Sequence, residues 1–207
     1  MRHPIVDTIV EEYHKGDVDL HQMVADIAGI NRKEAKVVNL GIMYGMGKGK
    51  LAAQLGISES EAAMLLTTHE QKVPFVRQLA KVASQRAEEF GQIRTLLGRV
   101  CRFDKWEPKG FGYNQPLTLE EANKKYGGVN RLKRAFTYKA LNKLIQGSAA
   151  DQTKKAMLDC YKEGLIPLLT VHDELCFSVE GDDQARRIKD IMENGLSDVL
   201  RVPSKVD

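Results

Sequence analysis

The sequence lacks the features that mark disulfide-rich, zinc-binding, membrane-spanning and secreted proteins. Its three cysteines (Cys101, Cys160 and Cys176) have no CxxC spacing and form no recognisable disulfide framework, so we expect no structural zinc site and a reducing compartment. No apolar run approaches the ~18 residues of a membrane-spanning helix, and the N-terminus lacks the apolar core of a signal peptide. We therefore expect a cytoplasmic protein without a membrane partner.

An excess of charge of one sign is also lacking. The 31 Lys and Arg residues nearly balance the 28 Asp and Glu residues, which leaves a formal net charge of +3. Any basic surface for a polyanion must therefore be local. Basic residues do gather in residues 32–50, 124–143 and 154–155. With 207 residues, 43% of them hydrophobic, the chain can bury the core of one large domain or of two lobes.

Four residues at four-residue spacing, Arg32, Lys36, Leu40 and Tyr44, form the most informative pattern in the chain. On a helix this spacing drifts by only ~40° per step, so the four side chains line one face. The cations suit phosphates, the apolar end suits a base or a sugar, and Gly45 lets a backbone approach closely. The alternative interpretation is a solvated basic face with Tyr44 in the core.

A second pattern occupies residues 168–179. The apolar run at 168–171 and the later alternation of apolar with polar residues predict a β-hairpin. His172, Asp173 and Glu174 then fall at its tight tip. Taken alone, acidic residues at a hairpin tip are ordinary turn chemistry.

The remaining segments predict a mostly helical protein. A capping box at Ser58 and Glu61 starts one of several helices in residues 4–90. Residues 103–128, which are rich in Gly and Pro, are expected to form a loop-rich insertion. A long helix is expected from Arg134 to about Gly164. With the hairpin, these segments predict an α+β fold in which mostly helical structure adjoins part of an antiparallel sheet.

Together these segments resemble family A DNA polymerases, the bacterial polymerase I and phage replicative kind. Residues 32–45 match R-x3-K-x3-(F/Y/L)-x3-YG, residues 142–151 match N-x3-QG-(T/S)-A-A-D, and residues 171–175 match V-H-D-E-L. Asp19-Leu20-His21 matches the D-(I/L)-H that precedes the nucleotide-binding helix in the family. The resemblance implies a helical fingers subdomain at residues 1–128, with the nucleotide-binding helix at 32–46, and a partial palm at 129–207.

The resemblance also implies a role for each matched residue. The incoming dNTP would be bound by His21, Arg32, Lys36, Leu40 and Tyr44. Lys36 would also donate a proton to the leaving pyrophosphate. Primer–template DNA would be contacted by Tyr44, Gly45, Asn142, Gln146 and His172. Asp173 would be the catalytic ligand of Mg²⁺, with Glu174 as a weaker neighbouring carboxylate.

The family's other carboxylate motif, D-x-S-x-x-E, does not occur in the sequence. Template-directed phosphoryl transfer uses two Mg²⁺ ions, and one acidic hairpin supplies too few of the oxygen ligands that Mg²⁺ prefers. We therefore expect a C-terminal fingers and palm fragment of a polymerase from a bacterial or phage-infected cell. We expect it to be inactive until an upstream segment brings the second catalytic aspartate.

Two other functions stay open. The isolated chain could hold nucleotide or DNA without chemistry, or it could be a helical regulatory protein whose basic helix binds RNA or a partner.

The sequence departs from the family pattern at two positions. Leu40 stands where most relatives carry Phe or Tyr, so contact with the deoxyribose should differ. Tyr138 stands where many bacterial relatives carry Arg, so one DNA contact is either lost or supplied by Lys139.

Overall fold

The computed structural model forms two compact units. It describes residues 4–15, 19, 21–22, 25–26, 29–72, 74–110, 115–202 and 204–206. The central unit is Asp19–Leu144, and the terminal unit is Met1–Val18 together with Ile145–Asp207. Helices and small two-stranded antiparallel sheets make up both units, which confirms the predicted α+β class. The units divide the chain elsewhere than the expected subdomain boundary between residues 128 and 129, which stays a prediction.

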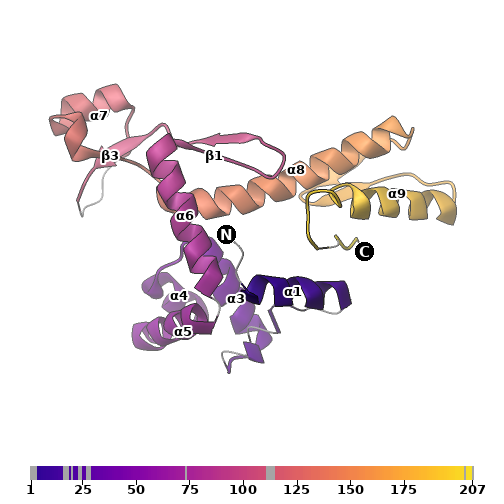
Figure 1. The fold of residues 1–207 in the computed structure, drawn as a ribbon, viewed down its shortest axis with the longest axis horizontal. Helices are drawn as coiled ribbons and strands as arrows, with labels where there is room; N and C mark the ends of the chain where they lie inside the picture. The colour runs from indigo at the N-terminus through magenta and orange to yellow at the C-terminus, as the bar shows by residue number, and fades with distance from the viewer. Residues whose placement is uncertain are drawn as a thin grey trace. The chain divides into compact units, whose positions relative to one another are not determined.

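Four helices build one end of the central unit: α3 (Arg32–Met43), α4 (Lys48–Leu55), α5 (Glu59–Lys72) and α6 (Pro74–Phe90). Figure 1 shows α3, α4 and α5 grouped at one end of α6. Their shared core contains Val38, Leu51 and Ala62, each at most 1% exposed, and burial of this apolar surface stabilises the group. The sequence also predicts a short helix at residues 20–28, and this segment falls largely outside the described residues.

Local signals fix the ends of these helices. Ser58 Oγ accepts a hydrogen bond from Glu61 N at 3.2 Å, and Ser58 N donates to Glu61 Oε2 at 2.8 Å. This confirms the predicted capping box. The Ser58 hydroxyl and then its backbone N–H hold the pKa of Glu61 below its usual value. Gly56 ends α4 with a φ of 70°, a conformation that favours glycine.

Two small antiparallel sheets form the other end of the central unit, beyond α6 (Figure 1). β1 (Gln92–Arg94) pairs with β2 (Val100–Arg102), and β3 (Trp106–Pro108) pairs with β4 (Leu132–Arg134). Arg134 joins them to α6, since its Nε donates to Glu88 O at 3.2 Å and its Nη1 donates to Phe103 O at 3.0 Å. Its guanidinium also lies 4.5 Å from the ring centroid of Trp106.

The expected loop-rich insertion at residues 103–128 was wrong in part. Besides β3, the structure has helix α7 (Leu119–Tyr126) there, which starts at a capping box between Thr118 and Glu121. Gly127 ends α7 in the left-handed conformation, with a φ of 75°. The Gly and Pro content that predicted loops therefore marks the ends of a short helix whose Ala122 is buried.

The expected start of the long helix at Arg134 was also wrong, because α8 spans Ala140–Lys162. Pairing of β4 with β3 holds Arg134 in an extended conformation. Phe136 then adopts a φ of 63°, and a 3₁₀ turn over Thr137–Lys139 precedes the helix. Strand pairing of Arg134 with Trp106 thus makes the helix start six residues later than expected.

The terminal unit contains α1 (Pro4–Lys15), most of α8, a hairpin of β5 (Leu169–Val171) and β6 (Glu174–Cys176), and α9 (Asp182–Asn194). The hairpin confirms the one predicted at 168–179. The sequence also predicts a helix over residues 184–199, and α9 starts two residues before that range and ends before the range does. Cys160 of α8 packs with Ile188 and Ile191 of α9. Arg201 binds Asp7 of α1 at 2.6 Å.

Candidate functional site

The stripe of Arg32, Lys36, Leu40 and Tyr44 faces outward from α3. Ala35, Val38 and Asn39 form the buried face of the helix. Arg32 and Lys36 are exposed, Leu40 is half-buried, and Tyr44 in the turn after α3 is 39% exposed. The structure therefore places Tyr44 on the surface rather than in the core, and the stripe is available to a ligand.

Asp19 anchors the start of the stripe. Arg32 Nε donates to Asp19 Oδ2 at 2.5 Å, and Asp19 Oδ1 accepts from the backbone N–H of His21 at 2.9 Å and of Gln22 at 3.0 Å. The Arg32 guanidinium, followed by the Gln22 N–H, holds the pKa of Asp19 below its usual value. The D-x-H segment and α3 are thus joined by an ion pair. Lys36 makes no ion pair with a described carboxylate, so its charge stays available.

Sequence reasoning missed Asn39, which contacts His21, and His69, which contacts Asn39. Asn39 Nδ2 lies 3.1 Å from His21 Nδ1, and Asn39 Oδ1 lies 3.0 Å from His69 Nε2. His69, on α5, is 4% exposed, and its burial lowers the pKa of its imidazole. A polar residue between Val38 and Leu40, beside the buried positions of α3, was the available signal for Asn39. His69 has no such signal, because its contact depends on how α5 packs.

Gly45 meets a cluster of aromatic and basic residues after α3. Its φ of 69° favours glycine, and a Cβ there would lie 3.5 Å from the ring of Tyr138. Tyr138 is 57% exposed. Lys139 Nζ lies 4.8 Å from the Phe136 ring centroid and 5.7 Å from that of Tyr138. A cation therefore lies beside Tyr138, and its contact with DNA stays a prediction.

Helix α8 carries both predicted amides. Asn142 is half-buried and Gln146 is exposed one turn later. Lys143, between them, lies with its Nζ 4.6 Å from the ring centroid of Phe103. The start of α8 is thus packed against the end of β2 in the central unit.

The carboxylates lie at the tip of the β5–β6 hairpin. Val171 pairs with Glu174, which leaves His172 and Asp173 as the two turn residues. Glu174 is therefore the first residue of β6 rather than part of the turn. His172 has a φ of 55°, which is uncommon outside glycine and is found at strained functional positions. Asp173 and Glu174 are exposed to solvent.

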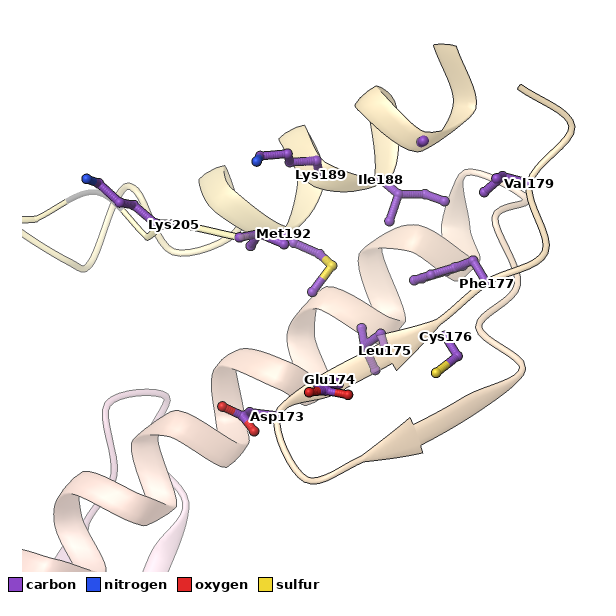
Figure 2. A pocket seen from close by; sticks show the side chains of 12 residues that line it. Asp173, Glu174, Leu175, Cys176, Phe177, Val179, Ile188, Lys189, Met192 and Lys205 are labelled. Atoms are coloured by element: carbon purple, nitrogen blue, oxygen red, sulfur yellow. The ribbon is translucent and has the colours of Figure 1, made fainter. Parts of the chain in front are cut away.

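A cleft of about 580 Å³ opens beside these carboxylates, between the hairpin and α9. Figure 2 shows Asp173 and Glu174 at one end of the cleft, with Phe177 and Met192 pointing into the space between the hairpin and α9. Lys189 and Lys205 also line it. The cleft thus joins an acidic tip, an apolar floor and a basic rim.

The hard oxygens of Asp173 and Glu174 fit the ligand preference of Mg²⁺. Within the described ranges, no group of three or more His, Cys, Asp or Glu side chains could hold a metal ion together. The role of Asp173 as a metal ligand therefore stays a prediction. Among the described helices, none is long and apolar enough to cross a membrane.

Comparison with known proteins identifies a family and several relatives of this chain. The family model for DNA polymerase family A matches residues 6–207. A DNA-directed DNA polymerase of Pseudomonas phage M6 is 36% identical over 92% of this chain and 30% of that protein. DNA polymerase I of Bacillus caldotenax is 33% identical over 97% of this chain and 22% of that protein.

A solved structure is similar as well. It is the POL domain of Pol1 from M. smegmatis in complex with DNA primer-template and dNTP, with a TM-score of 0.72 and 30% identity over 96% of this chain and 34% of that chain. The chain belongs to DNA polymerase family A. It spans about a third or less of the length of these relatives.

Proposed function

We propose that this chain supplies the nucleotide-binding fingers and part of the catalytic palm of a DNA-directed DNA polymerase. The observation that carries the proposal is the outward-facing stripe on α3 with Asp19 and His21 at its start. A stripe that begins with cations and ends with an exposed aromatic ring matches a nucleoside triphosphate, whose phosphates and base are at opposite ends.

Arg32, Lys36 and His21 would bind the triphosphate of the dNTP. Arg offers a planar fork and Lys a point charge for phosphate oxygens, and Lys36 would also protonate the leaving pyrophosphate. Leu40 would pack against the deoxyribose. Tyr44 and Gly45 would adjoin the nascent base pair. Asn142, Gln146 and His172 would contact the primer–template, whose minor groove presents acceptors at every base pair.

Asp173, beside Glu174, would hold Mg²⁺ at the hairpin tip. When bound, a pair of such ions would activate the primer hydroxyl and stabilise the pyrophosphate leaving group. Because the described residues offer only part of a metal site, a further segment carrying a second aspartate would complete it. The positively charged residues near the site would meanwhile position the DNA backbone.

A second candidate function is nucleotide or DNA binding without turnover. The incomplete set of metal ligands in the described residues favours it for the isolated chain. Binding of either ligand should weaken steeply with salt, because it depends on phosphate contacts. Fluorescence anisotropy with labelled primer–template at two salt concentrations measures this, and salt-independent binding would contradict it.

Single-nucleotide primer extension with Mg²⁺ separates the two candidates. One sample contains the chain alone, and the other contains the chain mixed with an upstream polymerase segment that carries D-x-S-x-x-E. Extension in the mixture alone supports a polymerase completed by a second segment. Failure in both samples, with salt-sensitive DNA binding retained, supports the binding function. Extension by the chain alone would refute the need for an upstream aspartate.

A further inference from the structure

Asn39 joins two histidines in the interior of the central unit. It is 5% exposed, so an unpaired amide there would cost stability. Both of its polar atoms have partners, because Nδ2 lies 3.1 Å from His21 Nδ1 and Oδ1 lies 3.0 Å from His69 Nε2. The three side chains come from α3, α5 and the D-x-H segment, so they connect three separate parts of the unit. We call this the His69–Asn39–His21 chain.

The amide fixes the direction of each hydrogen bond in this chain. A carbonyl oxygen only accepts, so His69 Nε2 carries the hydrogen that it donates to Asn39 Oδ1. An amide nitrogen only donates, so His21 Nδ1 accepts through its lone pair. A neutral imidazole has one N–H, which in His21 must then be on Nε2.

We propose that Asn39 and His69 are positioning residues that hold His21 in its Nε2–H tautomer, with this N–H directed to a phosphate oxygen of an incoming nucleotide. The nucleotide as ligand rests on the proposed function, whereas the tautomer rests on the hydrogen bonds alone. The opposite tautomer would present a lone pair at Nε2, which repels a phosphate oxygen. The backbone N–H of His21 also donates to Asp19 Oδ1 at 2.9 Å, so the main chain is held as well as the ring.

His69 suits this role because its burial favours the neutral form of the ring. The ring is 4% exposed, and burial lowers its pKa below the usual value for histidine. A neutral ring has a single N–H, so donation to Asn39 also fixes the tautomer of His69. The orientation of the Asn39 amide thus decides both tautomers, which makes the proposal measurable without a ligand.

Long-range ¹H–¹⁵N correlation NMR of the full chain reads the tautomer of each imidazole. We expect Nε2–H at both His21 and His69. His69→Gln keeps an N–H donor near the position of Nε2 and should leave the His21 tautomer unchanged. His69→Phe removes the donor and should turn His21 into a mixture of tautomers. His14, whose Nε2 lies 2.9 Å from the carbonyl oxygen of Arg201 in the terminal unit, is the internal control.

Asn39→Asp is a second variant, and it leaves the His69 side chain in place. A carboxylate only accepts, so His21 Nδ1 must then carry a hydrogen. We expect the NMR signals of His21 to change to an Nδ1-protonated form. This change would leave His14 unaffected, because His14 lies in the other unit.

Titration with dNTP in the same samples measures the consequence for binding. Loss of one well-placed hydrogen-bond donor corresponds to about fivefold weaker affinity in His69→Phe, whereas His69→Gln should stay within about twofold of the wild type. A fall in affinity in His69→Phe that His69→Gln rescues supports positioning.

Two results would overturn the proposal. One is a wild-type His21 with Nδ1–H or a mixture of tautomers, and the other is an unchanged His21 tautomer in both His69→Phe and Asn39→Asp. A wild-type chain that binds no dNTP would instead refute the proposed function. The tautomers measured without nucleotide would still decide whether the His69–Asn39–His21 chain holds the ring.

Discussion

At the scale of single residues, Asp19 is the carboxylate that binds Arg32, the first residue of the stripe. It accepts from Arg32 Nε and from two backbone N–H groups, and all three contacts favour the ionised form. The Arg32 guanidinium is the largest cause of the lowered pKa of Asp19. Because the unfolded chain lacks these contacts, ionised Asp19 stabilises the folded state at neutral pH.

The sign of this effect gives a pH dependence. A lowered folded-state pKa contributes stability above the ordinary value of 3.8, and the contribution is lost as the pH falls through the lower folded value. We expect Asp19→Asn to be slightly less stable than the wild type at pH 7, since exposed ion pairs contribute little. The difference should vanish in strong acid.

Urea unfolding of both proteins from pH 7 down into the acid range measures this difference. Arg32→Gln is the matched control, because it removes the largest cause of the pKa shift and should reduce the pH dependence at Asp19. A stability difference that does not change with pH would contradict the claim that ionised Asp19 stabilises the folded state.

Some residues of the candidate site could be predicted from the sequence and others could not. Arg32, Lys36 and Tyr44 could be predicted from spacing alone, since they share a helix face and the structure places them outward. Asn39 and His69 could not be predicted as a pair, because their contact joins residues 30 positions apart in sequence. Such a contact depends on tertiary packing of α3 with α5, which a single sequence does not encode locally.

At the scale of helices, α3 presents Lys36 as an exposed cation without a described ion-pair partner. We expect Lys36→Ala to weaken dNTP binding by about tenfold or more, because a hydrogen bond between charged groups is lost. Isothermal titration calorimetry at low salt measures the affinity. Lys81→Ala on α6 removes an equally exposed cation outside the stripe, and it should bind dNTP as the wild type does. Equal losses in the two variants would mean that only overall charge matters.

The end of α6 depends on a close approach between Gly91 and Arg134. Gly91 has a φ of 68°, and a Cβ there would lie 2.6 Å from Arg134 Cζ. Gly56 at the end of α4 has a similar φ of 70° with no atom within 4 Å. Gly56→Ala should therefore cost about 1–2 kcal/mol for backbone strain alone, and Gly91→Ala should cost roughly 1 kcal/mol more because Arg134 must move.

Urea unfolding gives the free energy of unfolding of both variants. Equal losses would show that Arg134 gives way without cost. A smaller loss in Gly91→Ala than in Gly56→Ala would contradict the packing described for Arg134, Glu88 and Phe103.

Some helix boundaries are set by local sequence and could be predicted, whereas others are set by tertiary pairing. The Ser58–Glu61 capping box is local, so the start of α5 could be predicted. Thr118 and Glu121 carry the same signal for α7, but the surrounding Gly and Pro residues concealed it. The start of α8 could not be predicted from residues 134–139, because β4 pairs with a strand more than 20 residues earlier.

At the scale of the whole molecule, the chain divides into two units that each carry part of the proposed site. The central unit has the stripe, Asp19 and His21, and the terminal unit has the carboxylates Asp173 and Glu174. The membership of the chain in DNA polymerase family A covers residues 6–207 and therefore includes both units. The proposed polymerase activity thus depends on residues of both units.

The most direct test of that claim is the rate of single-nucleotide incorporation by the chain mixed with an upstream segment carrying D-x-S-x-x-E. Asp173→Ala should lower the rate at least about a thousandfold, because a metal ligand contributes several kcal/mol to the transition state. Asp183→Ala, which removes an exposed carboxylate on α9, should leave the rate unchanged. Incorporation by Asp173→Ala at the wild-type rate would contradict the assignment of the hairpin carboxylate as catalytic.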